Sequence, residues 1–561
     1  MASRQEIIKH LSDEKAVDVL VIGAGINGIG TFRDLALNGV NVLLVDRGDF
    51  CSGASATSSH MAHGGIRYLE NGEFRLVQEA VRERNRMIMN APHLVKPLPT
   101  TIPIFKFWSG LLNAPLKFIN LLDRPSERGA FVIKFGLMMY DSFTSKQKTV
   151  PTHQFHGRAK SLEMFPKMNP DIKYTATYFD GQILSPERFS VELAMDGESE
   201  GDHAKALNYV SVVGFKNKEV LLRDEVTKKE FSIKAKLIVN AAGPWIDPVN
   251  KAIGIYGKYV GGTKGSHLVI DNPEMRKAVR DNEIFFENKD GRIVLIFPFY
   301  DKLIIGTTDL PIDDPDSARC TEDEEKYFIE MVGRVFPSLK IDPKSVVFRF
   351  SGVRPLEYQH AKTTGQITRD HTIKEDTISG IPVLSLVGGK WTSYRAFSEQ
   401  VADKSMAFLG LTRKSGTESL GIGGGKYLPK SENEIKDYVA AVAKKTGLSK
   451  EIATILFTRY GTLCEQIAQK IKEVGDKPLS SLPDWQVGEV EYLIESEKAM
   501  HIEDILVRRS TLAWLGKVKK ATVEEMADIF AKKCKWSEAE KKAEINRTYA
   551  ELKDLYGVIL S

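Results

Sequence analysis

Cysteine, long hydrophobic runs and an excess of one charge are all scarce in this chain of 561 residues. Its four cysteines lie far apart, form no C-x-x-C pair and have no histidine at metal-ligand spacing; they are Cys51, Cys320, Cys464 and Cys534. This pattern argues against a disulfide framework and against a zinc site. We therefore expect no metal ion, reduced thiols and a cytoplasmic location.

Neither sign of charge dominates. Lysine and arginine number 78 and aspartate and glutamate 74, so the formal net charge is +4. So small an excess argues against nucleic acid as a partner, although it leaves room for a local basic patch that binds a phosphorylated substrate. The composition, 42% hydrophobic and 27% charged, is that of an ordinary globular protein. At roughly 100–200 residues per domain, the length predicts about two to four domains.

No run of residues is long and apolar enough to predict a spanning helix or a secretory signal at the N-terminus. The segment 102–122 (IPIFKFWSGLLNAPLKFINLL) is apolar and aromatic, but two prolines and two lysines interrupt it. Two interpretations stay open. The segment could form a buried helical hairpin, or it could contact a bilayer surface through Phe107, Trp108 and the leucines. The second interpretation predicts a protein bound peripherally to the inner face of the cell membrane.

A mononucleotide-binding βαβ unit is predicted at the start of the chain. The β-branched run 18–22 indicates a buried strand, an apolar helical pattern continues to Leu37, and a second strand is predicted over 40–45. Between the first strand and the helix lies G-x-G-x-x-G, formed by Gly23, Gly25 and Gly28. These glycines permit a tight turn and a close approach of the backbone to a pyrophosphate, which would bind at the N-terminus of the helix.

The residues after the second strand favour FAD over NAD. Asp46 ends that strand, where an acid can accept hydrogen bonds from a ribose diol. A loop of small and hydroxyl-bearing residues follows at 53–59 and includes Ser58 and Ser59. Such a loop can enclose a long cofactor, whereas NAD enzymes usually continue from the acid into another helix. We therefore predict FAD as the cofactor.

The rest of the chain predicts two further units. Buried strands are expected at 236–240 and 383–387, and antiparallel strands at 266–270, 292–297 and 302–305. The fold class is therefore α/β, with a Rossmann-like FAD-binding domain, an inserted antiparallel-sheet substrate domain and a C-terminal helical domain. The expected boundaries are 1–100 with 151–250 and 345–410 for the FAD domain, 101–150 and 251–344 for the substrate domain, 411–429 for a linker, and 430–561 for the helical domain.

Ordered motifs along most of the chain resemble one family. They include VIGAGINGIG at 21–30, HGGIRYLE at 63–70, VNAAGPWID at 239–247, FSGVRPL at 350–356, VGGKWTSYR at 387–395 and ILVRRSTLAWL at 505–515. This sequence is similar to the FAD-dependent glycerol-3-phosphate dehydrogenases. It departs from them at Ser59-His60, where the family usually carries Thr-Lys, and over 105–128, which is longer than the usual connection.

Arginines are the expected phosphate ligands. Arginine binds phosphate oxygens bidentately, and the resemblance points to Arg354 and Arg369, with Arg67 as a third candidate. For a lone arginine, a surface or interdomain ion pair is the usual alternative. We also expect His267 and Asp309 to line the substrate pocket.

The predicted catalytic residues are His63, Lys390 and Arg354. His63 and His267 are the candidate bases, because an imidazole with a pKa of about 6.5 can accept a proton near neutral pH. We expect His63 to be the base and His267 to be a pocket residue. Lys390 follows two glycines at a strand end and can hold the substrate hydroxyl or the charge of the reduced flavin. We expect Gly389, Gly243 and Trp245 to contact the flavin.

The resemblance implies oxidation of sn-glycerol 3-phosphate to dihydroxyacetone phosphate, by hydride transfer from C2 to flavin N5. The electrons would pass to a quinone. The alternative is an oxidase that reduces oxygen to hydrogen peroxide, and a third hypothesis is a flavin-binding protein without catalysis. A homodimer is also compatible with the sequence.

Overall fold

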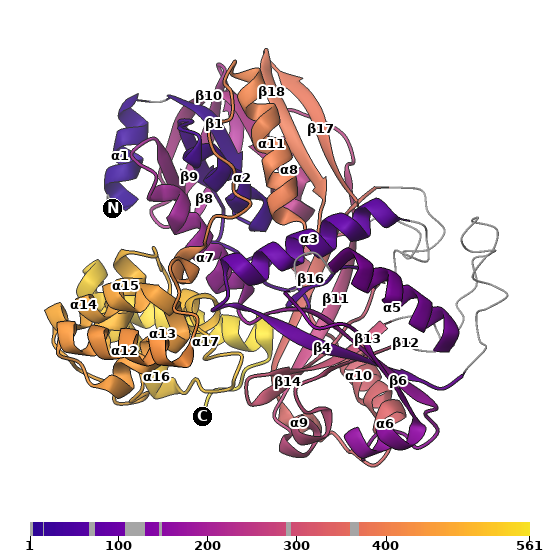
Figure 1. The fold of residues 1–561 in the computed structure, drawn as a ribbon. Coiled ribbons are helices and arrows are strands. Elements are labelled where there is room, and N and C mark those ends of the chain that lie inside the picture. Colours follow the sequence, from indigo (N-terminus) through magenta and orange to yellow (C-terminus); the bar gives the residue numbers. More distant parts are fainter. Residues whose placement is uncertain are drawn as a thin grey trace.

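The computed structural model describes residues 4–14, 16–66, 73–106, 130–144, 149–287, 293–358 and 370–561. Two sheets and a group of C-terminal helices make up this part of the chain (Figure 1). The helices are α1 (Arg4–Glu14), α2 (Ile26–Leu37), α3 (Phe74–Asn90), α5 (Ala130–Thr144), α6 (Arg158–Met164), α7 (Pro186–Glu198), α8 (Ile246–Ile253), α9 (Pro273–Val279), α10 (Glu322–Val335), α11 (Tyr394–Phe408), α12 (Glu432–Thr446), α13 (Lys450–Tyr460), α14 (Cys464–Val474), α15 (Val487–Glu495), α16 (Lys520–Cys534) and α17 (Glu538–Tyr556).

The first sheet is the predicted nucleotide-binding sheet. Its order is β17-β18-β10-β1-β2-β7, with β8 and β9 extending from β10, and the pairs among β18, β10, β1, β2 and β7 are parallel. The strands are β1 (Ala16–Ile22), β2 (Val42–Val45), β7 (Ala204–Leu207), β8 (Val210–Lys216), β9 (Glu219–Asp224), β10 (Glu230–Asn240), β17 (His371–Ile378) and β18 (Ile381–Gly388). Its central strands are apolar on both faces, because α2 and α11 pack on one face and α1, β8 and β9 pack on the other.

The second sheet is mainly antiparallel and follows the order β15-β11-β14-β13-β12-β4-β6-β3, with β16 paired to β11 and β5 to β6. Its strands are β3 (Met61–Ala62), β4 (Val95–Ile104), β5 (Gln154–Gly157), β6 (Tyr174–Ile183), β11 (Val260–Ile270), β12 (Glu283–Glu287), β13 (Ile293–Phe299), β14 (Lys302–Gly306), β15 (Leu310–Pro311) and β16 (Val346–Glu357). Helices α6, α9 and α10 lie at the end of this sheet in Figure 1. The predicted α/β fold with a second, antiparallel sheet is confirmed.

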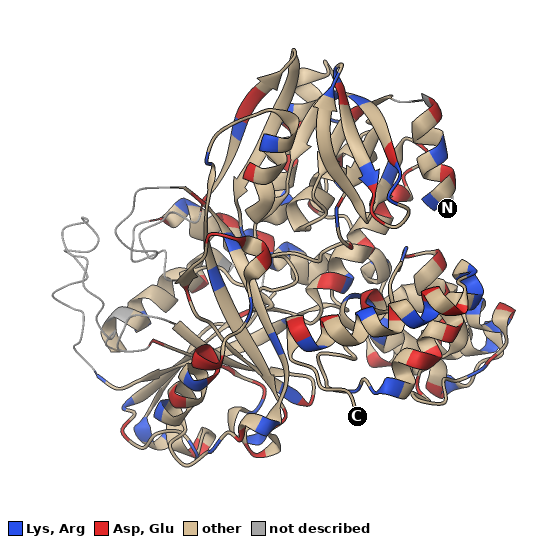
Figure 2. Ribbon diagram, turned by 180° about the vertical axis from the view of Figure 1, so that it is seen from behind, with Lys and Arg blue, Asp and Glu red and all other residues tan. Residues whose placement is uncertain are grey.

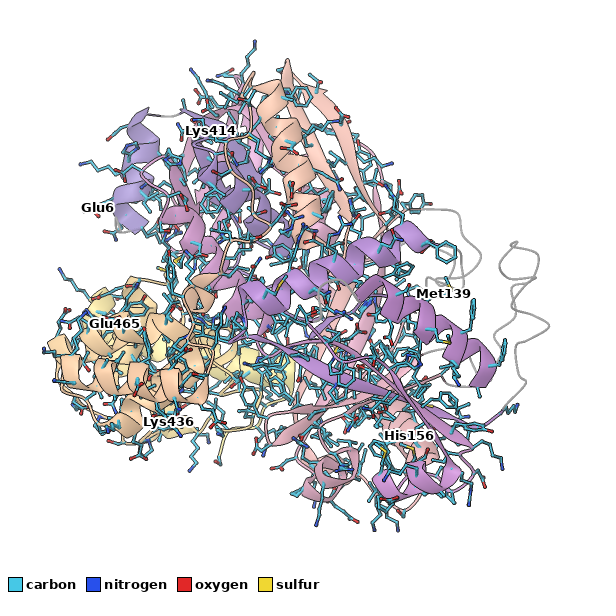
Figure 3. The ribbon with its side chains drawn as sticks, viewed as in Figure 1. Glu6, Met139, His156, Lys414, Lys436 and Glu465 are labelled. Carbon is cyan, nitrogen blue, oxygen red and sulfur yellow. The ribbon has the colours of Figure 1, made fainter. Side chains whose placement is uncertain are left out.

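The C-terminal helices form a separate group beside both sheets (Figure 1). The composition of the C-terminal part predicts helices over 432–446 and 487–499. Helix α12 has the first of these ranges, and α15 ends earlier than the second, at Glu495. Acidic and basic residues are interspersed along these helices (Figure 2). Lys436 lies on α12 and Glu465 on α14 (Figure 3). Its inner side is apolar and shares one hydrophobic core with Phe348 and Phe350 of the second sheet.

The predicted domain boundaries stay a prediction. Strand pairing shows to which sheet the strands near these boundaries belong. Strands β3 to β6 and β16 were expected in the nucleotide domain, but they pair within the second sheet. Their sheet is decided by pairing with strands that are distant in sequence, such as β11 for β16, and a local pattern does not reveal such pairs. Most of the apolar segment 102–122 lies outside the described residues. No described helix is long and apolar enough to cross a membrane.

Candidate active site between the two sheets

The glycine loop has the geometry that its spacing predicts. Gly23 has a φ of +102°, and a Cβ there would lie 2.6 Å from the carbonyl oxygen of Ala241. A Cβ on Gly28 would lie 1.9 Å from the carbonyl oxygen of Gly23. Helix α2 begins directly after Gly25, where the backbone N–H of Ile26 donates to Ser55 Oγ at 3.0 Å. The loop therefore brings backbone N–H groups to a helix N-terminus, where Ser55 Oγ accepts a hydrogen bond from one of them.

Asp46 closes this loop from the neighbouring strand. Its Oδ2 accepts a hydrogen bond from the N–H of Ala24 at 2.6 Å, and its Oδ1 accepts one from Gly48 at 2.8 Å. Burial raises the pKa of Asp46 to about 6, against these two hydrogen bonds, which lower it. The carboxylate is therefore charged at neutral pH and lies at the carboxyl end of β2, the predicted position for an acid that binds ribose.

The loop after Asp46 connects the nucleotide sheet to the second sheet. Ser59 Oγ lies 2.8 Å from His267 Nε2 on β11. A Cβ on Gly352 of β16 would lie 2.1 Å from Thr57 Oγ1, so that strand can pass only because the position is glycine. Ser58 Oγ accepts a hydrogen bond from the backbone N–H of His60 at 3.3 Å.

The same loop also contacts the end of β18. Trp391 Nε1 donates to the carbonyl oxygen of Ser55 at 2.8 Å, and Thr392 Oγ1 donates to that of His63 at 3.1 Å. Both residues directly follow Lys390, so the glycine loop, the second sheet and the end of β18 meet around residues 53–63. Sequence patterns indicated the loop 53–59, but not the contacts that Trp391 and Thr392 make with this junction.

The strand-like run before Arg354 and the proline after it predict that Arg354 lies in a loop facing the cofactor, but Arg354 lies inside strand β16, where it pairs with Thr263. The strand continues because β11 supplies partners as far as Glu357. The Arg354 guanidinium donates to Asp309 Oδ1, Thr307 Oγ1 and the carbonyl oxygen of Thr308, each at 3.1 Å. Asp309 therefore contacts the arginine in the structure.

A glycine makes room for that guanidinium. A Cβ on Gly265 would lie 2.3 Å from Arg354 Nη2 and 2.6 Å from Thr307 Oγ1. Gly265 lies on β11, opposite Gly352 of β16. The guanidinium is thus held on one side by hydrogen-bond acceptors that follow β14, and it packs on the other side against the backbone of Gly265 in β11.

His267 lies beside the arginine and is buried. Its ring stacks on Phe350 at 4.6 Å between centroids, and a Cβ on Gly306 would lie 2.0 Å from it. Burial lowers the pKa of His267 well below its ordinary value, and the positive charge of Arg354 and the neighbouring His60 lower it further. The imidazole is therefore neutral at physiological pH.

A buried polar cluster binds the backbone of the turn that carries His63. The N–H of Gly64 donates to Asp180 Oδ1 at 3.0 Å and to the Tyr140 hydroxyl oxygen at 3.1 Å. Arg84, which is completely buried, donates to the same two groups. No sequence signal indicated these three partners, because they come from α3, α5 and β6.

Gly389 and Lys390 approach the start of α2. Gly389 has a φ of +95°, and a Cβ there would lie 2.9 Å from Asn27 Nδ2. Asn27 Oδ1 is buried and has no hydrogen-bond partner among the described residues. A bound ligand that donates a hydrogen bond would satisfy this atom.

Gly243 and Trp245 lie in a short 3-10 turn after β10. Trp245 Nε1 donates to Asp316 Oδ1 at 3.0 Å, and the guanidinium of Arg47 lies 4.7 Å from its ring centre. A Cβ on Gly53 would lie 3.0 Å from the indole ring, so Trp245 packs against residues 53–59, the predicted flavin loop. Arg67 and Arg369, the other predicted phosphate ligands, lie outside the described residues.

The chain is similar to flavoenzymes along nearly its whole length. A sequence model of FAD dependent oxidoreductases matches residues 18–395, and a model of the C-terminal domain of alpha-glycerophosphate oxidase matches residues 415–541. A glycerol-3-phosphate dehydrogenase of Synechocystis sp. is 33% identical over 89% of this chain and 89% of its own. The chain belongs to the FAD-dependent glycerol-3-phosphate dehydrogenase family.

Other relatives agree with this family. The aerobic glycerol-3-phosphate dehydrogenase of Bacillus subtilis is 29% identical over 94% of this chain and 93% of its own. The X-ray structure of the Bacillus halodurans glycerol-3-phosphate dehydrogenase complexed with FAD has a TM-score of 0.75 and 26% identity, over 98% of this chain and 97% of that one.

The residues present fit FAD. The glycines keep Cβ atoms away from the loop before α2, where a pyrophosphate would bind. Asp46 at the end of β2 could accept hydrogen bonds from ribose hydroxyls. Asn27 Oδ1 is buried without a hydrogen-bond donor among the described residues, and a ligand N–H or O–H would satisfy it. Gly389 lets the backbone after β18 pack closely against Asn27. The prediction of FAD is confirmed by the family. The roles of individual residues stay predictions.

Proposed function

We propose that this enzyme oxidises sn-glycerol 3-phosphate to dihydroxyacetone phosphate and passes the electrons to a quinone. One observation carries the choice of a phosphorylated substrate. Arg354 is held by three acceptors beside a neutral, buried His267, at the point where the second sheet meets the flavin loop. The names of the relatives support the same substrate.

Bound FAD supplies the hydride acceptor, N5 of the flavin ring. Arg354, together with Arg369 and Arg67, binds the phosphate through charge-assisted hydrogen bonds. His63 accepts the hydroxyl proton and Lys390 holds the hydroxyl oxygen at C2. His267 and Asp309 shape the pocket, the second by holding the guanidinium of Arg354 at 3.1 Å.

Anaerobic mixing of the purified holoenzyme with glycerol 3-phosphate tests the substrate. We expect glycerol 3-phosphate to bleach the visible absorption band of the flavin. Glycerol, which lacks the phosphate, should leave the band unchanged. Persistence of the band with every polyol phosphate would contradict the proposal and favour a flavin-binding protein without catalysis.

Oxygen is the alternative to a quinone as the electron acceptor. The C-terminal match to alpha-glycerophosphate oxidase favours an enzyme that reduces oxygen to hydrogen peroxide. The two acceptors are separated by adding either air-saturated buffer or a soluble quinone to the reduced enzyme. We expect rapid reoxidation by the quinone and little peroxide. Equal or faster reoxidation by oxygen would favour the oxidase.

A lipid surface is the proposed location of the quinone reaction. Helix α5 exposes Phe131 (55%), Phe135 (60%) and Met138 (57%), which are spaced by four and three residues and so lie on one face. The opposite face packs into the protein through Ile133, Leu137 and Tyr140. Helix α5 lies at the outer edge of the molecule (Figure 1), and such an apolar stripe suits a bilayer interface.

Vesicle flotation tests this surface. We expect the wild type to bind vesicles and a Phe131→Ser/Phe135→Ser variant to lose most of the binding, while its rate with a soluble quinone stays unchanged. A matched control, Tyr256→Ser, removes another exposed aromatic residue far from α5 in sequence. Equal binding by all three proteins would contradict the proposed surface. The predicted homodimer is tested separately, by light scattering of the same samples.

A further inference from the structure

A buried ion cluster joins the C-terminal helices to the turn after β2. At its centre is the carboxylate of Asp49, whose side chain is 0% exposed. Arg508 Nε donates to Oδ2 at 2.8 Å, Arg509 Nη2 donates to Oδ1 at 2.9 Å, and Arg509 Nη1 also donates to Oδ2. Both arginines lie in a π-helical turn, Asp504–Arg509. Two residues more than 450 positions away in sequence therefore fix one carboxylate.

That carboxylate lies in the turn that builds the ribose end of the cofactor site. The turn starts at Asp46, which accepts a hydrogen bond from the N–H of Ala24 at 2.6 Å. It ends at Cys51, whose N–H donates to the carbonyl oxygen of Ala24 at 2.9 Å. Both ends of this turn therefore contact Ala24, and Asp49 lies between the two ends. A displacement of Asp49 therefore changes how Asp46 faces the glycine loop.

Tyr209 makes a second connection between the same two parts. Its backbone N–H donates to the carbonyl oxygen of Gly48 at 2.8 Å, and its hydroxyl donates to Asp504 Oδ1 at 2.6 Å. Asp504 also accepts a hydrogen bond from Arg508 Nη2 at 2.5 Å. The turn is held by backbone and side-chain contacts that both lead into the C-terminal domain.

We propose that Asp49, Arg508 and Arg509 are positioning residues for FAD, through which the C-terminal domain contributes to cofactor affinity. The three charges are buried, so removing one leaves its partners without compensation and forces the turn to rearrange. Binding is reciprocal between coupled sites. If docking of the C-terminal domain strengthens FAD binding, FAD binding must strengthen that docking by the same factor.

FAD titration of the full-length apoprotein tests the proposal. Flavin fluorescence gives the dissociation constant of FAD for the wild type and for Asp49→Asn, Arg509→Met and Arg509→Lys. We expect the first two to weaken FAD binding about ten- to hundredfold, the range found when outer partners of ligand-holding residues are removed. Arg509→Lys keeps the charge and should fall between them and the wild type. The KM for glycerol 3-phosphate in FAD-saturated enzyme should not change.

Arg188→Met is the matched control. Arg188 makes a buried ion pair with Glu497 across the same interface, and among the described residues none of its hydrogen bonds reaches the turn from Asp46 to Cys51. Its partner Glu497 contacts Arg509, whose Nη2 donates to the Glu497 carbonyl oxygen at 2.8 Å, so the control tests the same interface one contact away from the turn. We expect this control to lower the melting temperature of the apoprotein as much as Arg509→Met does, with FAD affinity within twofold of the wild type. An equal loss of FAD affinity in the control would overturn the proposal, because the effect would then belong to the interface as a whole.

Hydrogen–deuterium exchange of the wild type decides the question if variants fail to fold. We expect FAD to slow exchange in the peptide that contains residues 504–509, and to leave exchange in α12 unchanged. Exchange at 504–509 that does not respond to FAD would overturn the proposal. Neither measurement depends on which substrate or electron acceptor the enzyme uses.

Discussion

Arg354 and its neighbours give the sharpest predictions at the scale of single residues. Arg354→Met removes the charge that we propose binds the substrate phosphate. A charge-assisted hydrogen bond contributes about 1.5–3 kcal/mol, so we expect the KM for glycerol 3-phosphate to rise about 10- to 100-fold. The matched control is Arg349→Met on the same strand, because Arg349 pairs with Glu325. Steady-state kinetics should show an unchanged KM for the control. An unchanged KM for Arg354→Met would contradict the phosphate-binding role.

Gly265 is predicted to control the same arginine from the opposite strand. A Cβ in Gly265→Ala would lie 2.3 Å from Arg354 Nη2 and must displace it. We expect an increase in KM similar to that of Arg354→Met, although the arginine is still present. Gly261→Ala on the same strand is the control, since its Cβ would meet only ordinary contacts, the nearest at 3.4 Å. If the two variants have equal KM values, Gly265 does not position the guanidinium.

The two histidines should respond differently to replacement. His63→Asn removes the predicted base, and general base catalysis contributes typically about 10²–10⁴-fold. We expect kcat to fall by that order and the acid limb of its pH profile to disappear. His267→Asn should keep the acid limb and mainly raise KM. The reverse result would assign the base to His267, whose lowered pKa would then place the limb well below pH 6.5.

At the scale of elements, the first turn of α7 contains an acid that is neutral in the folded protein. Burial raises the pKa of Glu187 to about 8, from 4.5. Between these values the folded state holds a proton that the unfolded state has released, so the unfolding free energy falls as pH rises from about 4.5 to 8. Glu187→Gln should remove this slope and be more stable than the wild type at pH 8. Melting temperatures across this pH range provide the measurement, with Glu198→Gln at the other end of the helix for comparison. Parallel curves for wild type and Glu187→Gln would contradict the raised pKa.

Elements set by local pattern were predictable, and those set by distant partners were not. The β1–α2–β2 unit and the glycine loop follow from apolar periodicity and from steric limits that act over a few residues. The position of Arg354 inside β16 depends on pairing with β11, which is about 90 residues earlier. Helix α15 ends at Glu495, before its predicted end, because Lys498 has a φ of +57° and extends its ammonium to Glu198, 300 residues away. No local pattern encodes such contacts.

The same distinction applies to the candidate site. The glycines of the loop and Asp46 belong to one short segment, so their spacing was sufficient to predict that they lie together. The support of the His63 turn by Asp180, Tyr140 and Arg84 could not be predicted, because the three partners come from separate elements. A buried ion cluster of this kind leaves no periodic signal in the sequence.

For the whole molecule, the question is whether the C-terminal helices form an independent domain or a part of the enzyme core. The linker composition at 411–429 suggested independence. The structure has one hydrophobic core that contains Phe297, Phe299, Phe348 and Phe350 of the second sheet together with Trp514 and other C-terminal residues. Burial of a phenylalanine contributes about 1.5–3 kcal/mol. Exposure of these four would remove at most about 6–12 kcal/mol, as much as the whole stability of a typical domain, about 5–15 kcal/mol.

We therefore predict that residues 1–411 alone do not form a stable flavoprotein. Expressed alone, this fragment should aggregate or lack the flavin absorption band. Co-expression with residues 412–561 should restore a complex that contains FAD, because the interface joins apolar side chains to buried ion pairs such as Asp49 with Arg509. The Arg509→Met change in the second fragment should weaken that rescue, while Lys436→Met, on the exposed face of α12, should not. A soluble 1–411 fragment with a full complement of FAD would show that the helices are an accessory domain instead.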